Sequence, residues 1–205
     1  MLKIAHRINK IRELKQVPTE YGVEIDVRSY GRNLILNHEP HKTGDNLENY
    51  LANCEERFII FNVKEAGIEE EVIHLAEKYG VRDYFLLDVE FPFIYKVTRG
   101  QENPFRKIAV RFSEAEPLEF TLAQTLKGKS LVDWVWVDTN TCLPLNKNNY
   151  SQFKKAGFKL CLVCPERWKR PESIQDYINY MKENKIKIDA VMTSLSCLDK
   201  WKAMD

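Results

Sequence analysis

Two acidic residues, Glu24 and Asp26, lie two positions apart and could together form a chemically active site. They stand within an apolar run, residues 22–27, so a strand would place both carboxylates on one side and its apolar side chains on the other. Burying both charges unpaired would cost several kcal/mol per ion. The pair therefore predicts a hard divalent cation, Mg²⁺ or Ca²⁺, or else a salt-bridge network with Lys64 and Arg111.

Two histidines are expected near the acid pair. His6 and Arg7 end the first apolar run, residues 2–5, and a turn at residues 29–33 allows residues 34–36 to return as a short strand that delivers His38 to the same end. One imidazole can accept a proton while the other donates one. Acids and imidazoles would then share one pocket rim.

The composition bounds the class of protein. The chain has 205 residues, suited to one domain, and 31 Lys plus Arg against 30 Asp plus Glu, a net charge of +1 that favours neither nucleic acid nor anionic lipid. Its five cysteines are scattered, which suits a reducing compartment. With no apolar signal segment and no apolar run of about 18 residues, we expect a cytoplasmic protein without membrane insertion.

Strand-like and helical runs alternate along the whole chain. Helical spacing is predicted, in order, at residues 10–16, 45–56 (with Asp45 as the cap), 67–78, 93–97, 117–126, 147–156, 173–184 and 198–203. Between them lie strand-like runs, after the strand of the acid pair, at residues 58–64, 84–90, 107–112, 131–138, 158–163 and 189–193. Eight strand–helix units predict an α/β protein, a single (β/α)8 barrel over residues 1–205.

The polar residues collect where barrel enzymes carry their chemistry, at the carboxyl ends of the strands. Asn62 with Lys64, and Asp88 with Glu90, share a strand face by their two-residue spacing. Further round the barrel, Arg111, Trp136 and Asp138 stand at strand ends. We predict that they line the substrate pocket, with packing as the alternative for Trp136.

Four short motifs in this order resemble the glycerophosphodiester phosphodiesterase family, within the phosphatidylinositol-phosphodiesterase-like barrels. They are IAHR (residues 4–7), VEIDV (23–27), NHE (37–39) and NVK (62–64). The resemblance implies a TIM barrel, a phosphoric diester hydrolase of lipid metabolism and a small-molecule phosphodiester substrate. This chain is compact and lacks the larger insertion that many members carry after the second strand.

The resemblance also implies a role for each motif residue. His6 and His38 become the general acid and base, Glu24 and Asp26 hold the divalent cation, and Arg7 and Lys64 contact phosphate. The sequence departs from the family pattern at Ile8, where a Gly is usual, at Glu39, where an Asp is usual, and at Asn62, where an acid often supplies a third metal ligand. Asn can coordinate through its carbonyl oxygen, and Asp88 is a further candidate ligand.

Three functions fit these residues. The first is a metal-dependent phosphodiesterase acting on glycerophosphodiesters or sugar-phosphate diesters. The second is a phospholipase-like lyase that uses the same site and releases a cyclic phosphate. The third is a barrel that binds a phosphorylated ligand without turning it over, which Ile8 and Asn62 suggest. The oligomeric state is open.

Overall fold

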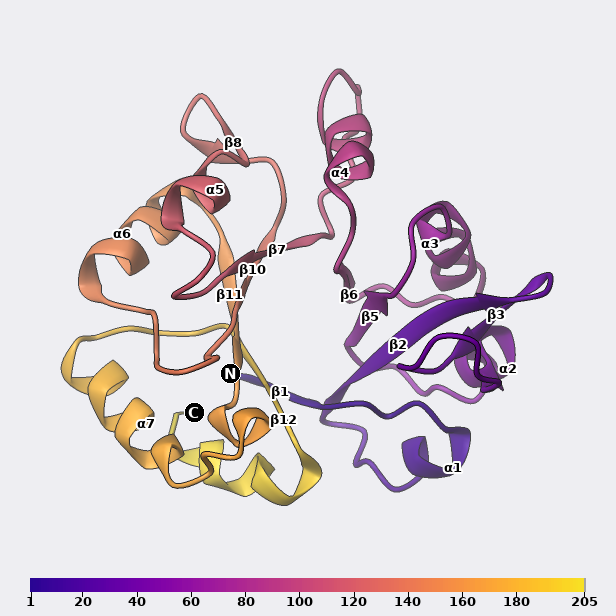
Figure 1. The fold of residues 1–205 in the computed structure, drawn as a ribbon, viewed down its shortest axis with the longest axis horizontal. Coiled ribbons are helices and arrows are strands. Elements are labelled where there is room, and N and C mark those ends of the chain that lie inside the picture. Colours follow the sequence, from indigo (N-terminus) through magenta and orange to yellow (C-terminus); the bar gives the residue numbers. More distant parts are fainter. Residues whose placement is uncertain (205) are drawn as a thin grey trace. The chain divides into compact units, whose positions relative to one another are not determined.

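A computed structural model describes residues 1–204 of the chain (Figure 1). It is an α/β protein that divides into two compact units, residues 4–93 and residues 1–3 together with the chain from Ile94 onward. The prediction of a single domain over the whole chain stays a prediction.

The unit of residues 4–93 is built on parallel strands that run in the order β1, β2, β5, β6. β1 (Leu2–Ala5) enters it through Ile4 and Ala5, which pair with the start of β2. The other three are β2 (Gly22–Tyr30), β5 (Ile59–Val63) and β6 (Tyr84–Leu87). All residues of β5 and β6 are buried, as expected for parallel strands covered on both faces.

The predicted hairpin after the acid pair is present. The end of β2 pairs antiparallel with β3 (Asn33–Leu36), and β3 in turn with β4 (Asp45–Asn46). Gly44 permits this second pairing, since a Cβ at that position would lie 2.1 Å from the carbonyl oxygen of Leu36. Thus β2 is extended beyond the parallel sheet, and the chain returns toward its acid pair.

The helices of this unit follow their strands. They are α1 (Ile11–Leu14), α2 (Leu47–Ala52), α3 (Glu69–Lys78) and the start of α4 (Phe91–Thr98). The predicted helix at residues 45–56 is shorter than expected, and its cap is Asn46, whose side chain accepts from the Asn49 N–H at 3.0 Å. Asp45 instead accepts from the Ile11 N–H at 2.7 Å. The prediction of Asp45 as the cap is therefore wrong, because the first N–H of α1, far away in sequence, binds its carboxylate.

The second unit also rests on a parallel sheet. Its strand order is β7 (Ala109–Phe112), β10 (Trp134–Val137), β11 (Lys159–Val163) and β12 (Ala190–Thr193). Leu2, which belongs to this unit, donates its N–H to the Asp189 carbonyl at 3.0 Å. On one face, the rings of Phe112 and Phe153 pack edge to face with centroids 5.0 Å apart.

The connecting elements of the second unit depart from the predictions at three places, one of them a 3₁₀ helix at Pro165–Trp168 that was not predicted. They are α5 (Leu118–Leu122), the hairpin β8 (Thr125–Leu126) with β9 (Lys129–Ser130), α6 (Lys147–Ala156), η1 (Pro165–Trp168), α7 (Ser173–Glu183) and η2 (Leu195–Met204). The helix expected through residue 126 ends at Leu122 and a hairpin follows. The last helix is a 3₁₀ helix. Within residues 1–204, no helix is long and apolar enough to cross a membrane.

Candidate active site

The acid pair lies buried on β2. Glu24 and Asp26 are 1 % and 0 % exposed, and their alternation along the strand puts both side chains, together with that of Arg28, on one face. Nearby are the ammonium group of Lys64, 3.3 Å from Asp26 Oδ1, and the Arg7 guanidinium. The pair is therefore buried with basic side chains beside it, and the binding of a divalent cation there stays a prediction.

Glu24 is held by groups from both neighbouring strands. Its Oε1 accepts from Asn62 Nδ2 and its Oε2 from the Arg7 N–H, each at 2.8 Å. His6 Nε2 lies 3.9 Å from Oε2. Burial, and then the negative charge of Asp26, raise the pKa of Glu24 to about 7. Burial therefore makes the charged form of Glu24 less favourable than that of an exposed carboxylate.

Asp26 is oriented by a residue that the sequence did not single out. Asn9 donates from Nδ2 to Asp26 Oδ2 at 2.8 Å and accepts from the Asp26 N–H at 2.8 Å, a reciprocal pair. Arg7 Nε is 3.9 Å from the same Oδ2. Since Asn9 lies three residues after His6, the turn beyond β1 supplies an imidazole, a guanidinium and a carboxamide to the same two acids.

That turn depends on an unusual backbone conformation at Arg7. Arg7 has φ = 55°, in the left-handed region that non-glycine residues rarely adopt. Its N–H bonds Glu24 Oε2, and the next N–H, of Ile8, bonds the Glu24 carbonyl at 2.9 Å. Ile8 itself is buried and has no positive φ. The glycine usual at that position in the family is thus not needed for this turn.

Lys64 links two acids. Its Nζ lies 3.3 Å from Asp26 Oδ1 and 3.3 Å from Asp88 Oδ2, so the ends of β2, β5 and β6 share one ammonium group. Asp88 has φ = 60°, a second left-handed residue at this edge of the sheet. The salt-bridge network considered from the sequence thus exists in part, with Asp88 as the further partner of Lys64.

His38 lies at the same edge, after β3. The Asn37 N–H bonds the Asp26 carbonyl at 3.0 Å, which fixes the chain just before the histidine. His38 Nδ1 is 2.7 Å from Glu39 Oε1, and this hydrogen bond lowers the pKa of Glu39. A carboxylate that pairs with Nδ1 selects the tautomer in which Nε2 is free to accept a proton.

The donor set beside the acid pair fits a hard cation. The buried Asn62 Oδ1 accepts no hydrogen bond from any residue in the described chain, and the buried Asp26 Oδ1 accepts none either but has the Lys64 ammonium 3.3 Å away. Asp26 and Asn62 are register partners on β2 and β5. Carboxylate and amide oxygens are what Mg²⁺ and Ca²⁺ prefer. Within residues 1–204, no group of three or more His, Cys, Asp and Glu is arranged to hold a metal, so this set depends on the amide.

The remaining predicted pocket residues belong to the second unit. Arg111 Nη1 donates to Asp138 Oδ2, which joins the ends of β7 and β10. Trp136 is buried, 4 % exposed. Their predicted contact with substrate stays a prediction.

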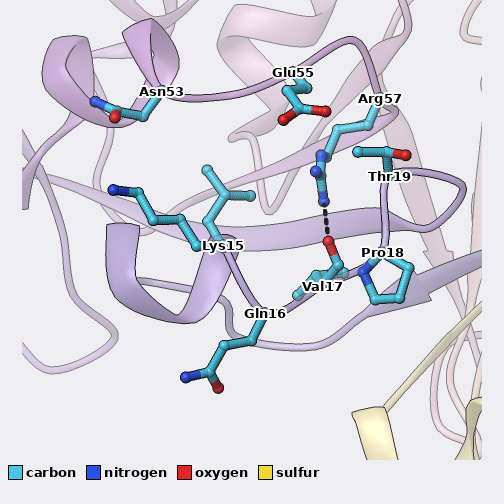
Figure 2. A pocket seen from close by; sticks show the side chains of 9 residues that line it. Lys15, Gln16, Val17, Pro18, Thr19, Asn53, Glu55 and Arg57 are labelled. Atoms are coloured by element: carbon cyan, nitrogen blue, oxygen red, sulfur yellow. Dashed lines mark hydrogen bonds between the residues drawn. The ribbon is translucent and has the colours of Figure 1, made fainter.

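A pocket of about 300 Å³ lies elsewhere in the first unit (Figure 2). Loop residues 15–19 line it with Asn53, Glu55 and Arg57, and Arg57 Nη1 donates to the Val17 carbonyl at 3.3 Å. None of the predicted site residues lines this pocket. The candidate site is therefore defined by its polar contacts rather than by this cavity.

Two site residues were missed by the sequence analysis, Asn9 and Arg28. A period of two along β2 places Arg28 on the face of Glu24 and Asp26, so the strand pattern alone could have found it. Nothing comparable marks Asn9, because its contact with Asp26 depends on the left-handed turn at Arg7.

Comparison with known proteins supports the fold. No protein-family model matches the chain, and no curated protein matches its sequence at a significant level. Among the solved structures that resemble the chain are the following three. A glycerophosphodiester phosphodiesterase of Thermotoga maritima aligns with a TM-score of 0.66 and 15 % identity over 94 % of each chain.

The other two structures give the same result. A protein of Agrobacterium tumefaciens, provisionally named a glycerophosphoryl diester phosphodiesterase, aligns with a TM-score of 0.67 and 11 % identity over 98 % of this chain and 96 % of its own. A glycerophosphoryl diester phosphodiesterase of Parabacteroides distasonis aligns with a TM-score of 0.57 and 11 % identity, over 93 % and 81 %. At these identities the likeness establishes a shared α/β fold.

Proposed function

We propose that the chain is a metal-assisted phosphodiesterase acting on small glycerophosphodiesters or sugar-phosphate diesters. One observation carries the proposal: a buried acid pair, beside a buried amide oxygen that accepts no hydrogen bond, stands among an imidazole, a guanidinium and an ammonium group at one sheet edge. The similarity to three phosphodiesterase structures supports it. We further propose that the strands close into a (β/α)8 barrel and that Arg111, Trp136 and Asp138 line the pocket for the substrate's alcohol.

In this mechanism the anionic substrate is bound by charge. Arg7 offers a planar fork to two phosphoryl oxygens, and its side chain is 34 % exposed, within reach of a ligand. Lys64 adds a point charge between Asp26 and Asp88. Glu24, Asp26 and the Asn62 amide oxygen would hold Mg²⁺ or Ca²⁺, with Asp88 as a further candidate. When bound, such an ion neutralises phosphoryl charge as it grows in the transition state.

The two histidines carry the protons. His38, paired through Nδ1 with Glu39, accepts or donates a proton at Nε2, and His6 acts as its counterpart. Each proton transfer is worth roughly 10² to 10⁴-fold in rate.

The test is turnover by the purified protein with and without Mg²⁺, Ca²⁺ or Mn²⁺. Glycerophosphocholine, glycerophosphoglycerol and a nitrophenyl phosphodiester are the substrates. We expect metal-dependent activity that falls roughly 10² to 10⁴-fold in His6→Ala and His38→Ala. His74→Ala, which removes an exposed histidine of α3, is the matched control and should keep full activity. Activity unchanged by both site substitutions would disprove the proposal.

A non-catalytic binding protein is the second candidate, because Asn62 leaves the donor set one carboxylate short and Lys64 is already paired with two acids. Such a protein would bind a phosphorylated ligand with equal affinity in wild type and His38→Ala, and would show no turnover. If turnover occurs, ³¹P NMR of the product separates hydrolysis, which gives a phosphate monoester, from a lyase reaction that stops at the cyclic phosphate.

A further inference from the structure

Arg28 is the third residue on the β2 face that carries Glu24 and Asp26, and it does not bind either acid in the contacts described above. Its side chain is 16 % exposed and points at two main-chain carbonyls. Nε and Nη2 donate to the His38 carbonyl at 3.2 and 3.0 Å, and Nη1 donates to the Lys64 carbonyl at 3.1 Å. One guanidinium thus joins two chain segments that are 26 residues apart in the sequence.

Both segments lie beyond the ends of strands. β3 ends at Leu36 and β5 ends at Val63, so the carbonyls of His38 and Lys64 fall outside the regular ladder of the sheet. A buried or half-buried carbonyl needs a donor. Arg28 provides it for both at once, because its N–H groups are fixed in one plane and point outward in different directions, Nε and Nη2 to the His38 carbonyl and Nη1 to the Lys64 carbonyl. A lysine ammonium has no such fork.

The guanidinium is in turn held in place. Glu65 Oε2 lies 3.9 Å from Arg28 Nη1, and Glu65 Oε1 accepts from the Ser29 N–H at 2.7 Å. The residue after Lys64 therefore binds the residue after Arg28, and it supplies the negative charge that balances the guanidinium. This arrangement orients Arg28 toward the carbonyls without any contribution from a ligand.

We propose that Arg28 is a positioning residue, which sets the distance between the His38 imidazole and the Lys64 ammonium by binding both main chains. The inference rests on the proposed function, in which His38 transfers a proton and Lys64 contacts phosphate. It goes further by assigning a role to a residue that touches neither substrate nor cation. A displacement of about 1 Å in such a pair can cost on the order of 10²-fold in rate.

The test uses Arg28→Lys and Arg28→Ala in the full chain. We expect kcat to fall by about 10 to 100-fold, because the displaced His38 would transfer its proton less well. We expect KM to rise, because the displaced Lys64 would contact the phosphate less well. Guanidinium chloride at millimolar concentration should restore part of the activity of Arg28→Ala, because the ion can occupy the vacated space and bind the same carbonyls. Guanidinium chloride should not restore the activity of Arg28→Lys, because the lysine side chain fills the space.

Arg57→Lys and Arg57→Ala are the matched controls. Arg57 also donates from Nη1 to a loop carbonyl, that of Val17, but it binds no site residue (Figure 2). Its variants should keep wild-type kcat and KM. If they lose activity as the Arg28 variants do, the effect is one of general stability and the positioning role is disproved, as it also is if Arg28→Lys is as active as wild type.

Hydrogen exchange measured by mass spectrometry provides a readout that needs no activity. In Arg28→Lys, exchange should rise in peptides covering residues 37–41 and 63–66 and stay unchanged over residues 15–19. If the wild-type protein turns over none of the substrates, the proposed function fails, yet faster exchange would still support the bridge by Arg28. Unchanged exchange at residues 37–41 and 63–66 would overturn it.

Discussion

Asn62 is the residue that sets how many negative charges the buried site around the acid pair carries. It faces Asp26 across the parallel pair of β2 and β5, and its Nδ2 donates to Glu24. A third carboxylate there would stand beside two others in a buried site, where like charges repel strongly. The Asn62 amide avoids this repulsion when no cation is bound. In exchange, the site has one negative charge fewer with which to bind a cation.

Asn62→Asp should therefore make the protein depend on a divalent cation. We expect a lower melting temperature than wild type in EDTA, because the introduced carboxylate would repel Glu24 and Asp26. With Ca²⁺ or Mg²⁺ we expect the loss to be recovered and the cation to bind roughly tenfold more tightly, about 1.4 kcal/mol. Thermal unfolding and calorimetric titration measure the two effects.

Asn62→Ala separates charge from packing in the same experiment. It removes both the donor to Glu24 and the orphan oxygen, so it should weaken cation binding below that of wild type. If Asn62→Asp and Asn62→Ala respond to the cation alike, the donor set given above is wrong.

At the scale of elements, α6 shows how far local sequence can specify a helix. The predicted range, residues 147–156, is the range found. Asn146 and Asn149 form a reciprocal capping box, and Gly157 ends the helix with φ = 91°, where a side chain would strain the backbone. The start, the end and the amphipathic face of α6 are therefore all specified by the residues from Asn146 to Gly157.

Asn146→Ala should lower the free energy of unfolding by about 1 kcal/mol, since two N–H groups of the first turn would lose their acceptor. Urea denaturation measures the change. Asn148→Ala, one residue into the same turn and exposed, is the control and should stay within about 0.5 kcal/mol of wild type. Equal losses in both variants would argue against the capping box.

α2 is the contrasting case. Its sequence offers Asp45 and Asn46 as neighbouring caps, both residue types that favour this position. The choice of Asn46 follows from the demand of the Ile11 N–H for the Asp45 carboxylate, 34 residues away. The sequence around α2 alone could not predict this choice, because it depends on a contact with a distant segment.

At the scale of the whole molecule, three cysteines are packed inside the second unit. All five are free, and Cys161, Cys164 and Cys197 are buried. Trp201 Nε1 donates to Cys164 Sγ at 3.3 Å, which joins the 3₁₀ helix η2 to the end of β11. Burial, and then the charge of Glu166, raise the pKa of the Cys164 thiol from 9.0 to about 12.

This shift predicts a loss of stability in alkaline solution. Below pH 9 the thiol is protonated in both states. As the pH rises from 9 toward 12 it ionises only in the unfolded chain, which lowers the free energy of unfolding by up to about 1.4 kcal/mol per pH unit. Cys164→Ser should therefore show a shallower decline between pH 9 and 11 than wild type, as measured by urea denaturation.

Cys142→Ser is the control for that measurement, since Cys142 is exposed. Its decline with pH should match wild type. A Cys164→Ser curve parallel to that of wild type would mean that the thiol is not desolvated in the folded protein.

Much of the fold could be read from the chain. The apolar runs, their alternation with helical spacing and the hairpin after the acid pair are found at or near the predicted residues, since burial on both faces leaves a continuous apolar signature. The hairpin of β8 and β9 was missed because its strands have two residues each, too few to show a period.

The sequence by itself determined that two acids would share one strand face and that, if buried, they would need a cation or basic side chains beside them, because alternation along a strand and the cost of burying charge are local facts. Only the tertiary structure decided which partners they have. Asn9 comes from the turn after β1, whereas Asn62 and Lys64 come from β5 and the residue after it, and their contacts depend on strand register and on one left-handed turn. Those contacts are long-range, so their geometry exists only once the sheet has formed.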